Sequence, residues 1–396
     1  MESFKWGLIL SIRVMIRGVG AMGLGIVEVL KKFPDFEVVS VTDKNLDALN
    51  IAKKFVSEKA LVTVKAEEAL NVGPDVLIDA TTSIFESVFF LQRALEKGIH
   101  VVLMNSEVDQ VFGRILAETA KENNVILTSD AGDQYGVLAR LIANVRLMGF
   151  KIVMAGNNKG FLDRYANPNS IANEAAIRRL SRTQCTAYTD GTKLAIEMAI
   201  IANAENLALL GETMVGPRVD NVMDALTAFD LNKARDLGGV VDYVLGANPG
   251  GSVFVVGYSN DPEDRFYMNY YKMGKGPYYL FLRPYHLCHF ETPFTLYKLF
   301  KHKEPVLVQN KRVLEVSAYA KTNLRAGSKL DGIGGFNLYG LLEKPSGLPI
   351  GLSEKAVLTK AKKKNEPIEW GDVEFPEYDS ALKLWEEQER KEKNRA

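Results

Sequence analysis

The chain has 396 residues, more than one ordinary hydrophobic core accommodates, so we expect two or three domains. Its 49 lysine and arginine residues balance its 49 aspartate and glutamate residues, and this zero net charge argues against a nucleic-acid partner or an acidic membrane surface. The two cysteines, Cys185 and Cys288, exclude a disulfide framework and indicate a reducing, cytoplasmic location.

The N-terminal segment does not have the pattern of a targeting or membrane sequence. It carries the acid Glu2, and Arg13 and Arg17 interrupt the apolar residues that follow. A membrane-spanning helix needs about 18 unbroken apolar residues, and no other segment reaches that length. We therefore expect a soluble protein with a small-molecule substrate and no membrane partner.

Up to about residue 155, short apolar runs alternate with amphipathic stretches. This alternation predicts an α/β fold whose N-terminal domain is a Rossmann-type, doubly wound parallel sheet. The expected strands are 12–16, 37–42, 76–80, 100–104, 125–128 and 151–155, and the expected helices include 26–33, 85–97 and 112–123.

A glycine-rich turn follows the first expected strand and opens the first helix. The run Gly18-Val19-Gly20-Ala21-Met22-Gly23 matches G-x-G-x-x-G, the pattern of a dinucleotide-binding loop. The first glycine permits the tight turn, the second lets a pyrophosphate approach the backbone, and the third lets helix and strand pack closely. The phosphates would contact the N–H groups at the start of this helix.

An acid stands where such a loop needs one. Asp43 follows Gly23 by 20 residues, at the end of the second expected strand, where a carboxylate binds the ribose hydroxyls and repels a 2′-phosphate. This favours NAD, whereas the adjacent Lys44 could pair with the extra phosphate of NADP. After the expected strand 76–80, Thr81 and Thr82 suit contact with the nicotinamide ribose, and Ser83 is a candidate helix N-cap.

Further polar residues follow the next two strands, where a substrate would bind. Asn105, Glu107 and Asp133 are our candidate substrate ligands. Together with Asp109 and Asp130, Glu107 and Asp133 could hold a divalent ion. Turns and helix caps use the same residue types, however, so we predict no metal.

From 156 to 305 the pattern changes to that of an α+β domain, for which we predict catalysis and dimerisation. Helices are expected over 170–182 and 191–210. Lys193 is the first candidate for the group that meets the alkoxide in hydride transfer, because a lysine in the first helical turn opposes the helix dipole and Asp190 is near enough to orient it. Lys159 is the second, with Asn157 and Asn158 as substrate ligands.

The spacing of His286, His289 and Glu291 is compatible with a zinc site on a continuous helix. Pro284 and Pro293 oppose a continuous helix, so aromatic packing is the favoured interpretation.

The last part, from about 306, is punctuated by glycine and proline turns and is expected to be rich in strands, at 313–320, 340–343 and 356–359. A charged helix is expected over 380–395.

Several runs resemble homoserine-dehydrogenase-like oxidoreductases that carry a C-terminal SAF domain. The resemblance covers nearly the whole chain, and its most specific part is the run from Ala318 to Gly335. The runs that carry it are 18–23, 105–109, 131–134, 156–160, 190–193, 318–335 and 349–352.

The resemblance implies three domains: a Rossmann domain over 1–155, a catalytic and dimerisation domain over 156–305, and a β-clip SAF domain over 306–396. It implies NAD or NADP and a homodimer. Asp190 and Lys193 mirror the family's aspartate–lysine pair. Lys321 and Arg325, near the start of the expected SAF domain, could bind a phosphate or carboxylate or could lie at the surface. Where homoserine dehydrogenases carry an active-site lysine after the asparagine, this chain has Ser106, so the resemblance leaves the substrate open.

Two other functions stay open at this point. Some members of the SAF group act like 1-deoxyxylulose 5-phosphate reductoisomerase. A protein of another class, a redox sensor that holds NAD(P) without turnover, would need no buried lysine beside the nicotinamide.

Overall fold

The computed structural model describes residues 11–376 and 379–394, and the chain forms two compact units. Unit 1 contains residues up to 108, 115–133 and 287–308, and unit 2 contains 109–114, 134–286 and the residues from 309 onward. The expected features at Glu2 and at Arg395 lie outside the described residues. The three-domain division stays a prediction.

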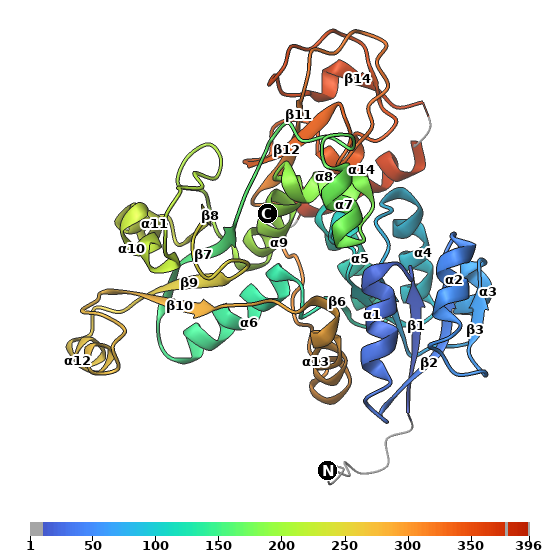
Figure 1. Ribbon diagram of the computed structural model, residues 1–396, viewed down its shortest axis with the longest axis horizontal. Helices are drawn as coiled ribbons and strands as arrows, with labels where there is room; N and C mark the ends of the chain where they lie inside the picture. Colours follow the sequence, from blue (N-terminus) through green and yellow to red (C-terminus); the bar gives the residue numbers. More distant parts are fainter. Residues whose placement is uncertain (1–10, 377–378, 395–396) are drawn as a thin grey trace. The chain divides into compact units, whose positions relative to one another are not determined.

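Unit 1 is built on a six-stranded sheet in the order β3-β2-β1-β4-β5-β6, and all of its strand pairs are parallel (Figure 1). This order is that of the Rossmann fold, so the predicted α/β fold class is confirmed. The strands are β1 (Ile12–Arg17), β2 (Phe36–Thr42), β3 (Leu61–Thr63), β4 (Val76–Asp79), β5 (His100–Leu103) and β6 (Leu127–Ser129).

The connections between these strands are helical, as right-handed parallel crossovers require. They are α1 (Ala21–Leu30), α2 (Leu46–Ala52), α3 (Ala66–Leu70), α4 (Phe85–Glu96) and α5 (Ser106–Glu122). A later segment completes the unit with η2 (Cys288–Glu291), α13 (Thr292–Tyr297) and η3 (Lys298–His302).

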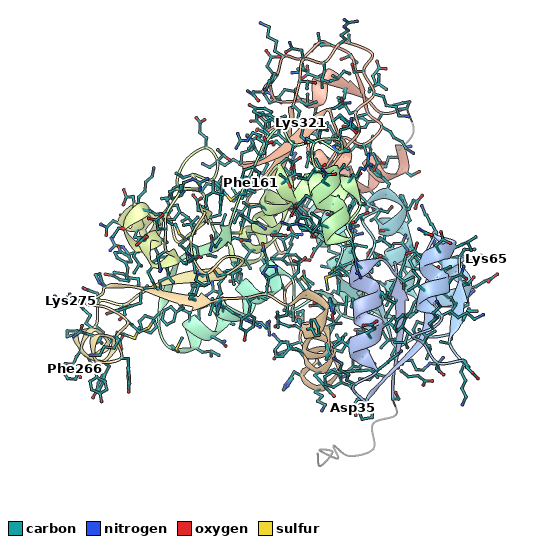
Figure 2. The ribbon with its side chains drawn as sticks, viewed as in Figure 1. Asp35, Lys65, Phe161, Phe266, Lys275 and Lys321 are labelled. Atoms are coloured by element: carbon teal, nitrogen blue, oxygen red, sulfur yellow. The ribbon has the colours of Figure 1, made fainter. Side chains whose placement is uncertain are left out.

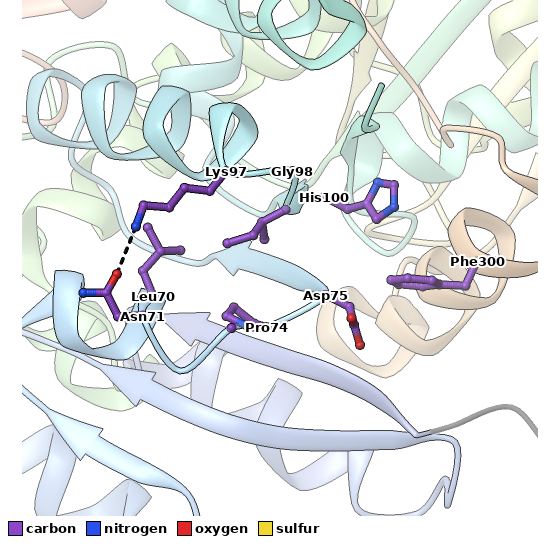
Figure 3. A pocket seen from close by; sticks show the side chains of 10 residues that line it. Leu70, Asn71, Pro74, Asp75, Lys97, Gly98, His100 and Phe300 are labelled. Carbon is purple, nitrogen blue, oxygen red and sulfur yellow. Dashed lines mark hydrogen bonds between the residues drawn. The ribbon is translucent and has the colours of Figure 1, made fainter. Parts of the chain in front are cut away.

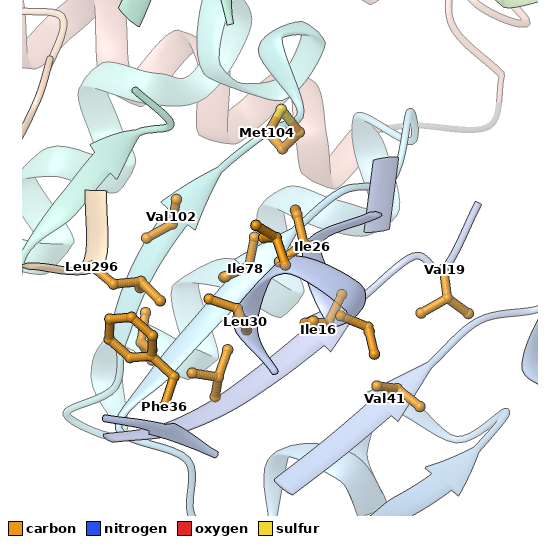
Figure 4. Packing of buried hydrophobic residues seen from close by; sticks show 14 of the residues in the cluster. Ile16, Val19, Ile26, Leu30, Phe36, Val41, Ile78, Val102, Met104 and Leu296 are labelled. Atoms are coloured by element: carbon orange, nitrogen blue, oxygen red, sulfur yellow. The ribbon is translucent and has the colours of Figure 1, made fainter. Parts of the chain in front are cut away.

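The core between α1 and the sheet is formed mainly by β-branched and aliphatic side chains, with Phe36 among them (Figure 4). Ile16, Ile26 and Ile78 are fully buried in it. Burial of each such side chain contributes roughly 1.5–3 kcal/mol. Leu296 and Leu299 of the later segment belong to the same core, so unit 1 needs chain from beyond residue 290.

Two strand assignments differ from the sequence analysis. The expected strand 151–155 is not part of the parallel sheet, and β3 supplies the sixth strand instead. All three residues of β3 are only half buried, so this edge strand lacks the apolar run by which buried strands are found.

Helix α4 begins at Phe85 with Ile84 as its N-cap residue, so the prediction of Ser83 as the cap is wrong.

Unit 2 contains a mixed four-stranded sheet in the order β10-β9-β7-β8. Only the β7–β8 pair is parallel. The strands are β7 (Lys151–Lys159), β8 (Val240–Leu245), β9 (Val253–Tyr258) and β10 (Tyr278–Arg283).

Helix α9 (Thr192–Glu205) is the central helix of unit 2, and nearly all of its residues are buried. It contacts α6 (Gln134–Leu147), α8 (Arg182–Thr189), β8 and two later strands, and these contacts bury both its many apolar side chains and its polar ones. The other elements are α7 (Ala172–Arg178), η1 (Val222–Asp224), α10 (Ala225–Ala228), α11 (Leu231–Asp236) and α12 (Pro262–Tyr270).

The last part of the chain has strands, as expected, in two antiparallel pairs, β11 (Glu315–Ala320) with β12 (Leu338–Glu343) and β13 (Val357–Leu358) with β14 (Val373–Glu374). It also holds η4 (Ile350–Leu352), η5 (Trp370–Asp372) and α14 (Asp379–Lys393). That this part is a SAF domain stays a prediction. Within the described ranges, no helix is long and apolar enough to cross a membrane.

Asp130, which directly follows β6, is a buried carboxyl group of unit 1. It accepts hydrogen bonds from the Gly132 N–H (2.8 Å) and from the Thr295 hydroxyl (3.1 Å), and so it connects the end of β6 to α13. Its burial raises its pKa to about 6.

We expect Asp130→Asn to remove a pH dependence of stability. The pKa of Asp130 is higher in the folded state than in the unfolded state. Protonated Asp130 therefore contributes its full stabilisation of the fold below about pH 4, and this stabilisation is lost as the pH rises through about 6. The free energy of unfolding, from urea titrations between about pH 4 and about pH 7, should fall less in the variant, by up to about 3 kcal/mol. Equal pH slopes for both proteins would contradict this.

Candidate active site

The glycine loop of unit 1 has the geometry that close packing and an anion require. Gly18 has φ +86°, in the left-handed region, and a Cβ on Gly23 would lie 1.8 Å from the Gly18 carbonyl oxygen. At Gly20 a Cβ would meet no described atom within 4 Å. Gly20 is the N-cap residue of α1 and provides no side-chain hydrogen bond to the first turn. The open space therefore adjoins the N–H groups of Ala21 and Met22, and it fits a pyrophosphate.

Asp43 is fixed in place by backbone donors. Its Oδ2 accepts from the Val19 N–H and its Oδ1 from the Asn45 N–H, both at 2.8 Å. Each carboxylate oxygen keeps lone-pair capacity for a ribose hydroxyl. The neighbouring Lys44 forms an exposed ion pair with Glu86. These positions fit the adenosine ribose of a dinucleotide.

A buried ion pair lies at the carboxyl ends of β1 and β4, and the sequence analysis missed it. Arg17 Nη1 lies 2.9 Å from Asp79 Oδ1 and 2.6 Å from Ser87 Oγ. Arg17 directly precedes Gly18, so the pair fixes the strand end from which the glycine loop starts. The available signal was an arginine directly after the apolar run 14–16 and directly before the glycine loop.

Thr81 and Asn105 extend this network. The Thr81 hydroxyl donates to Asp79 Oδ1 (3.0 Å), and Asn105 Nδ2 donates to Asp79 Oδ2 (3.1 Å) and to the Ser83 carbonyl (2.8 Å). Asn105 Oδ1 accepts from the Val108 N–H at the start of α5. Asn105 thus fixes the loop after β4, whereas Thr82 is exposed.

The acids that follow β5 and β6 do not gather into one group. Glu107 is buried in the first turn of α5 in unit 1. Asp109 belongs to unit 2, where its Oδ1 accepts from Gln309 (3.0 Å), and Asp133 is half buried in unit 1. Among the described residues, no set of three or more histidines, cysteines and acids is placed to hold a metal ion.

A cavity of about 410 Å³ lies in unit 1 at the amino ends of β4 and β5 (Figure 3). Its lining includes Asp75, Lys97, His100 and Phe300. Ligands of parallel α/β sheets bind beyond the carboxyl ends of the strands, and none of the predicted site residues lines this cavity. It is therefore not the candidate active site.

In unit 2, Lys159 and Asn157 converge at the end of β7. Lys159 Nζ donates to Gln134 Oε1 (3.0 Å) and lies 3.6 Å from Glu197 Oε2. Asn157 Nδ2 donates to the same Gln134 oxygen. The side chain of Lys159 is 15% exposed and that of Glu197 is 2% exposed, so this charged pair is largely removed from water. Gln134 was not predicted, because a glutamine that starts a helix has no distinctive spacing.

Asn158, on the opposite face of β7 from its neighbours, has a structural role. Its Nδ2 donates to the carbonyl oxygens of Ala247 (2.8 Å) and Pro249 (2.7 Å). Asn158 therefore fixes the loop between β8 and β9.

Lys193 and Glu197 lie one turn apart on the same face of α9, and both are buried. Lys193 Nζ lies 5.9 Å from the centroid of the Tyr188 ring.

Asp190, which we expected to orient Lys193, pairs with Lys321 at 2.7 Å. Figure 2 labels Lys321 in the last part of the chain. Lys321 Nζ also donates to the carbonyl oxygens of Ala166 (2.8 Å) and Gly335 (2.9 Å), so its ammonium is fully satisfied. Burial raises the pKa of Asp190, and Lys321 opposes that shift. Lys321 is therefore a buried partner of Asp190, and the surface position considered for it is wrong.

The histidine motif is divided between the two units. His286 belongs to unit 2, whereas His289 belongs to unit 1, where its ring packs against Gly25 and lies 4.4 Å from the Phe290 ring, centroid to centroid. Short helices replace the continuous helix that a zinc site would need.

Comparison with known proteins agrees with a cofactor domain followed by a catalytic domain. Residues 18–129 match the family described as homoserine dehydrogenase, NAD binding domain, and residues 132–292 match the family described as oxidoreductase DRL, catalytic domain. The homoserine dehydrogenase of Bacillus subtilis (strain 168) is 24% identical over 208 residues, which are 48% of this chain and 48% of that protein. The chain therefore aligns with about half the length of that relative.

Two solved structures are similar at low identity. A hyperthermophilic archaeal homoserine dehydrogenase in complex with NADPH is 16% identical, with a TM-score of 0.45 over 76% of this chain and 100% of that chain. The dipicolinate-bound dihydrodipicolinate reductase from Paenisporosarcina sp. TG-14 is 15% identical, with a TM-score of 0.40 over 76% and 97%. The two family matches indicate an NAD-binding domain followed by an oxidoreductase catalytic domain.

Two alanine substitutions separate cofactor binding from folding. Gly20→Ala adds a methyl group to open space, so we expect unchanged thermal stability and at least a tenfold weaker affinity for NADH in a fluorescence titration. Gly23→Ala collides with the Gly18 carbonyl and should lower the melting temperature as well. An unchanged NADH affinity in Gly20→Ala would show that the pyrophosphate does not bind at this turn.

The Asp190–Lys321 pair yields a stability prediction. Lys321→Met leaves the Asp190 carboxylate buried without its partner, and the free energy of unfolding should fall by about 3–5 kcal/mol in urea titrations. The control is Lys360→Met, because Lys360 is 66% exposed and lies 3.5 Å from Asp372; its effect should stay within about 0.5 kcal/mol. Equal losses in the two variants would contradict the assignment.

Proposed function

We propose that this chain is a homoserine-dehydrogenase-like enzyme that transfers a hydride between a nicotinamide and the carbonyl or hydroxyl carbon of a small polar substrate, with or without a phosphate group. The observation that carries the proposal is the largely buried ammonium of Lys159, held by Gln134 and near Glu197, inside the segment that matches an oxidoreductase catalytic domain. A redox sensor has no need of this arrangement.

The cofactor is held by the loop from Gly18 to Gly23 and by Asp43, with Thr81 and Thr82 placed for the nicotinamide ribose. When bound, the dinucleotide supplies or accepts the hydride. NAD is favoured over NADP, because the Asp43 carboxylate repels a 2′-phosphate and Lys44 is already paired with Glu86.

Lys159 is the proposed acid. In the reducing direction its ammonium donates a hydrogen bond to the substrate carbonyl oxygen, and it releases a proton to that oxygen as negative charge develops there. The Glu197 carboxylate stabilises the ammonium form of Lys159 before transfer. Lys193, one helical turn from Glu197 on α9, adds a second positive charge. Proton transfer by a positioned group accelerates such steps by about 10²–10⁴.

The substrate is proposed only as a class. Ser106 stands where the resemblance expects an active-site lysine, which argues against homoserine itself. Asn157, Glu107 and Asp133 stay candidate substrate ligands, and the homodimer and the SAF domain stay proposals of the sequence analysis.

The test starts with fluorescence titrations of NADH and NADPH, followed by assays with homoserine in the oxidative direction and with small aldehydes, ketones and sugar phosphates in the reductive direction. We expect tighter binding of NADH and turnover of at least one compound. Lys159→Met should lower kcat by about 10²–10⁴ without changing the NADH affinity. The matched control is Lys151→Met, at the exposed start of the same strand, which should keep full activity. Binding of neither nucleotide below millimolar concentration would overturn the proposal.

A further inference from the structure

Four side chains of unit 2 form one hydrogen-bonded chain that leads to Lys159. Gln134 is the first residue of α6 and is buried. Its Oε1 accepts from Lys159 Nζ (3.0 Å) and from Asn157 Nδ2. Its Nε2 lies 3.4 Å from His286 Nε2, and His286 Nδ1 lies 3.0 Å from the Gly251 carbonyl oxygen.

The direction of every hydrogen bond in this chain is determined by its two ends. An ammonium can only donate, so the Gln134 atom that faces Lys159 must be the oxygen, and the Gln134 amide nitrogen must face His286. At the other end a backbone carbonyl can only accept, so His286 Nδ1 must carry a proton. Because the Gln134 nitrogen donates, His286 Nε2 must accept. A neutral imidazole protonated on Nδ1 satisfies both ends.

The Gly251 carbonyl, at the end of the hydrogen-bonded chain, is held in place by the strand that carries Lys159. The Asn158 side chain donates to Ala247 and Pro249, and the Asn158 N–H donates to the Ser252 carbonyl (3.0 Å). These bonds fix the loop that contains Gly251. The carbonyl that selects the His286 tautomer and the ammonium that Gln134 holds are therefore both positioned by consecutive residues of β7.

We propose that Gln134 is a positioning residue for Lys159, and that neutral His286, with its proton on Nδ1, locks the Gln134 amide in the orientation that holds the ammonium. The proposal rests on the proposed role of Lys159. If His286 carried its proton on Nε2, two donors would face each other. The Gln134 amide would then turn its nitrogen toward Lys159 and Asn157, and the ammonium would lose its acceptor. Gln134 also orients Lys159 without adding a negative charge.

The first measurement is the tautomer of His286, by long-range ¹H–¹⁵N spectra of protein labelled with ¹⁵N-histidine. The chain has four histidines, so His286→Gln assigns the signal and His302→Gln, an exposed site, serves as the control. We expect a protonated Nδ1 and an unprotonated Nε2. The opposite tautomer would overturn the proposal.

The second measurement changes Gln134. Gln134→Glu keeps an acceptor for Lys159 and presents an acceptor to His286 Nε2, so His286 should bind a second proton on Nε2 while it keeps the proton on Nδ1. Gln134→Leu removes both contacts, and kcat should fall by about 10²-fold while the NADH affinity stays unchanged. Wild-type kcat in Gln134→Leu, or the wild-type His286 spectrum in Gln134→Glu, would overturn the proposal.

The spectra separate this proposal from the proposed function, because they need neither cofactor nor substrate. If no compound is turned over but His286 has its proton on Nδ1 and responds to Gln134→Glu, the hydrogen-bonded chain stands and the enzymatic proposal fails. If Lys159→Met is inactive but His286 carries its proton on Nε2, the enzymatic proposal stands and this one fails.

Discussion

A lysine ammonium that is removed from water needs hydrogen-bond acceptors around it, and two largely buried lysines of unit 2 obtain them from distant parts of the sequence. Lys321 meets it completely, with the Asp190 carboxylate and two backbone carbonyls. Lys159 meets it with one neutral amide oxygen and a carboxylate at 3.6 Å. The difference separates a lysine whose bonding capacity is used by the fold from one that retains capacity for a ligand. The first cross-links segments that are far apart in the sequence, and the second is the residue for which we propose a catalytic role.

Much of the cofactor half could be predicted from the sequence because its signals are local. The glycine spacing, the acid 20 residues later and the alternation of strands and helices all follow from the geometry of one turn and one crossover. The edge strand β3 escaped prediction because half-buried residues leave no apolar run. The strand 151–155 was assigned to the wrong sheet because its apolar pattern is the same in either.

The catalytic half could be predicted only in part, because its contacts join residues that are remote in sequence. Lys159 was found from its place at the end of a strand, but its partners Gln134 and Glu197 lie on two different helices. Asp190 was matched with Lys193 on proximity and on the family resemblance, whereas the fold pairs it with Lys321. Sequence spacing identifies residues whose side chains could take part in catalysis, but it does not reveal which residues they contact in the fold.

The order in which the chain is made has a consequence for how it folds. Unit 1 lacks Leu296 and Leu299 until the ribosome has made most of unit 2. Helix α9 is mostly apolar and almost wholly buried, and it cannot be fully covered before β11 and β12 exist. A growing chain therefore exposes aggregation-prone apolar surface for most of its synthesis. Because the segments of the two units alternate along the sequence, neither unit is suited to expression as one continuous fragment.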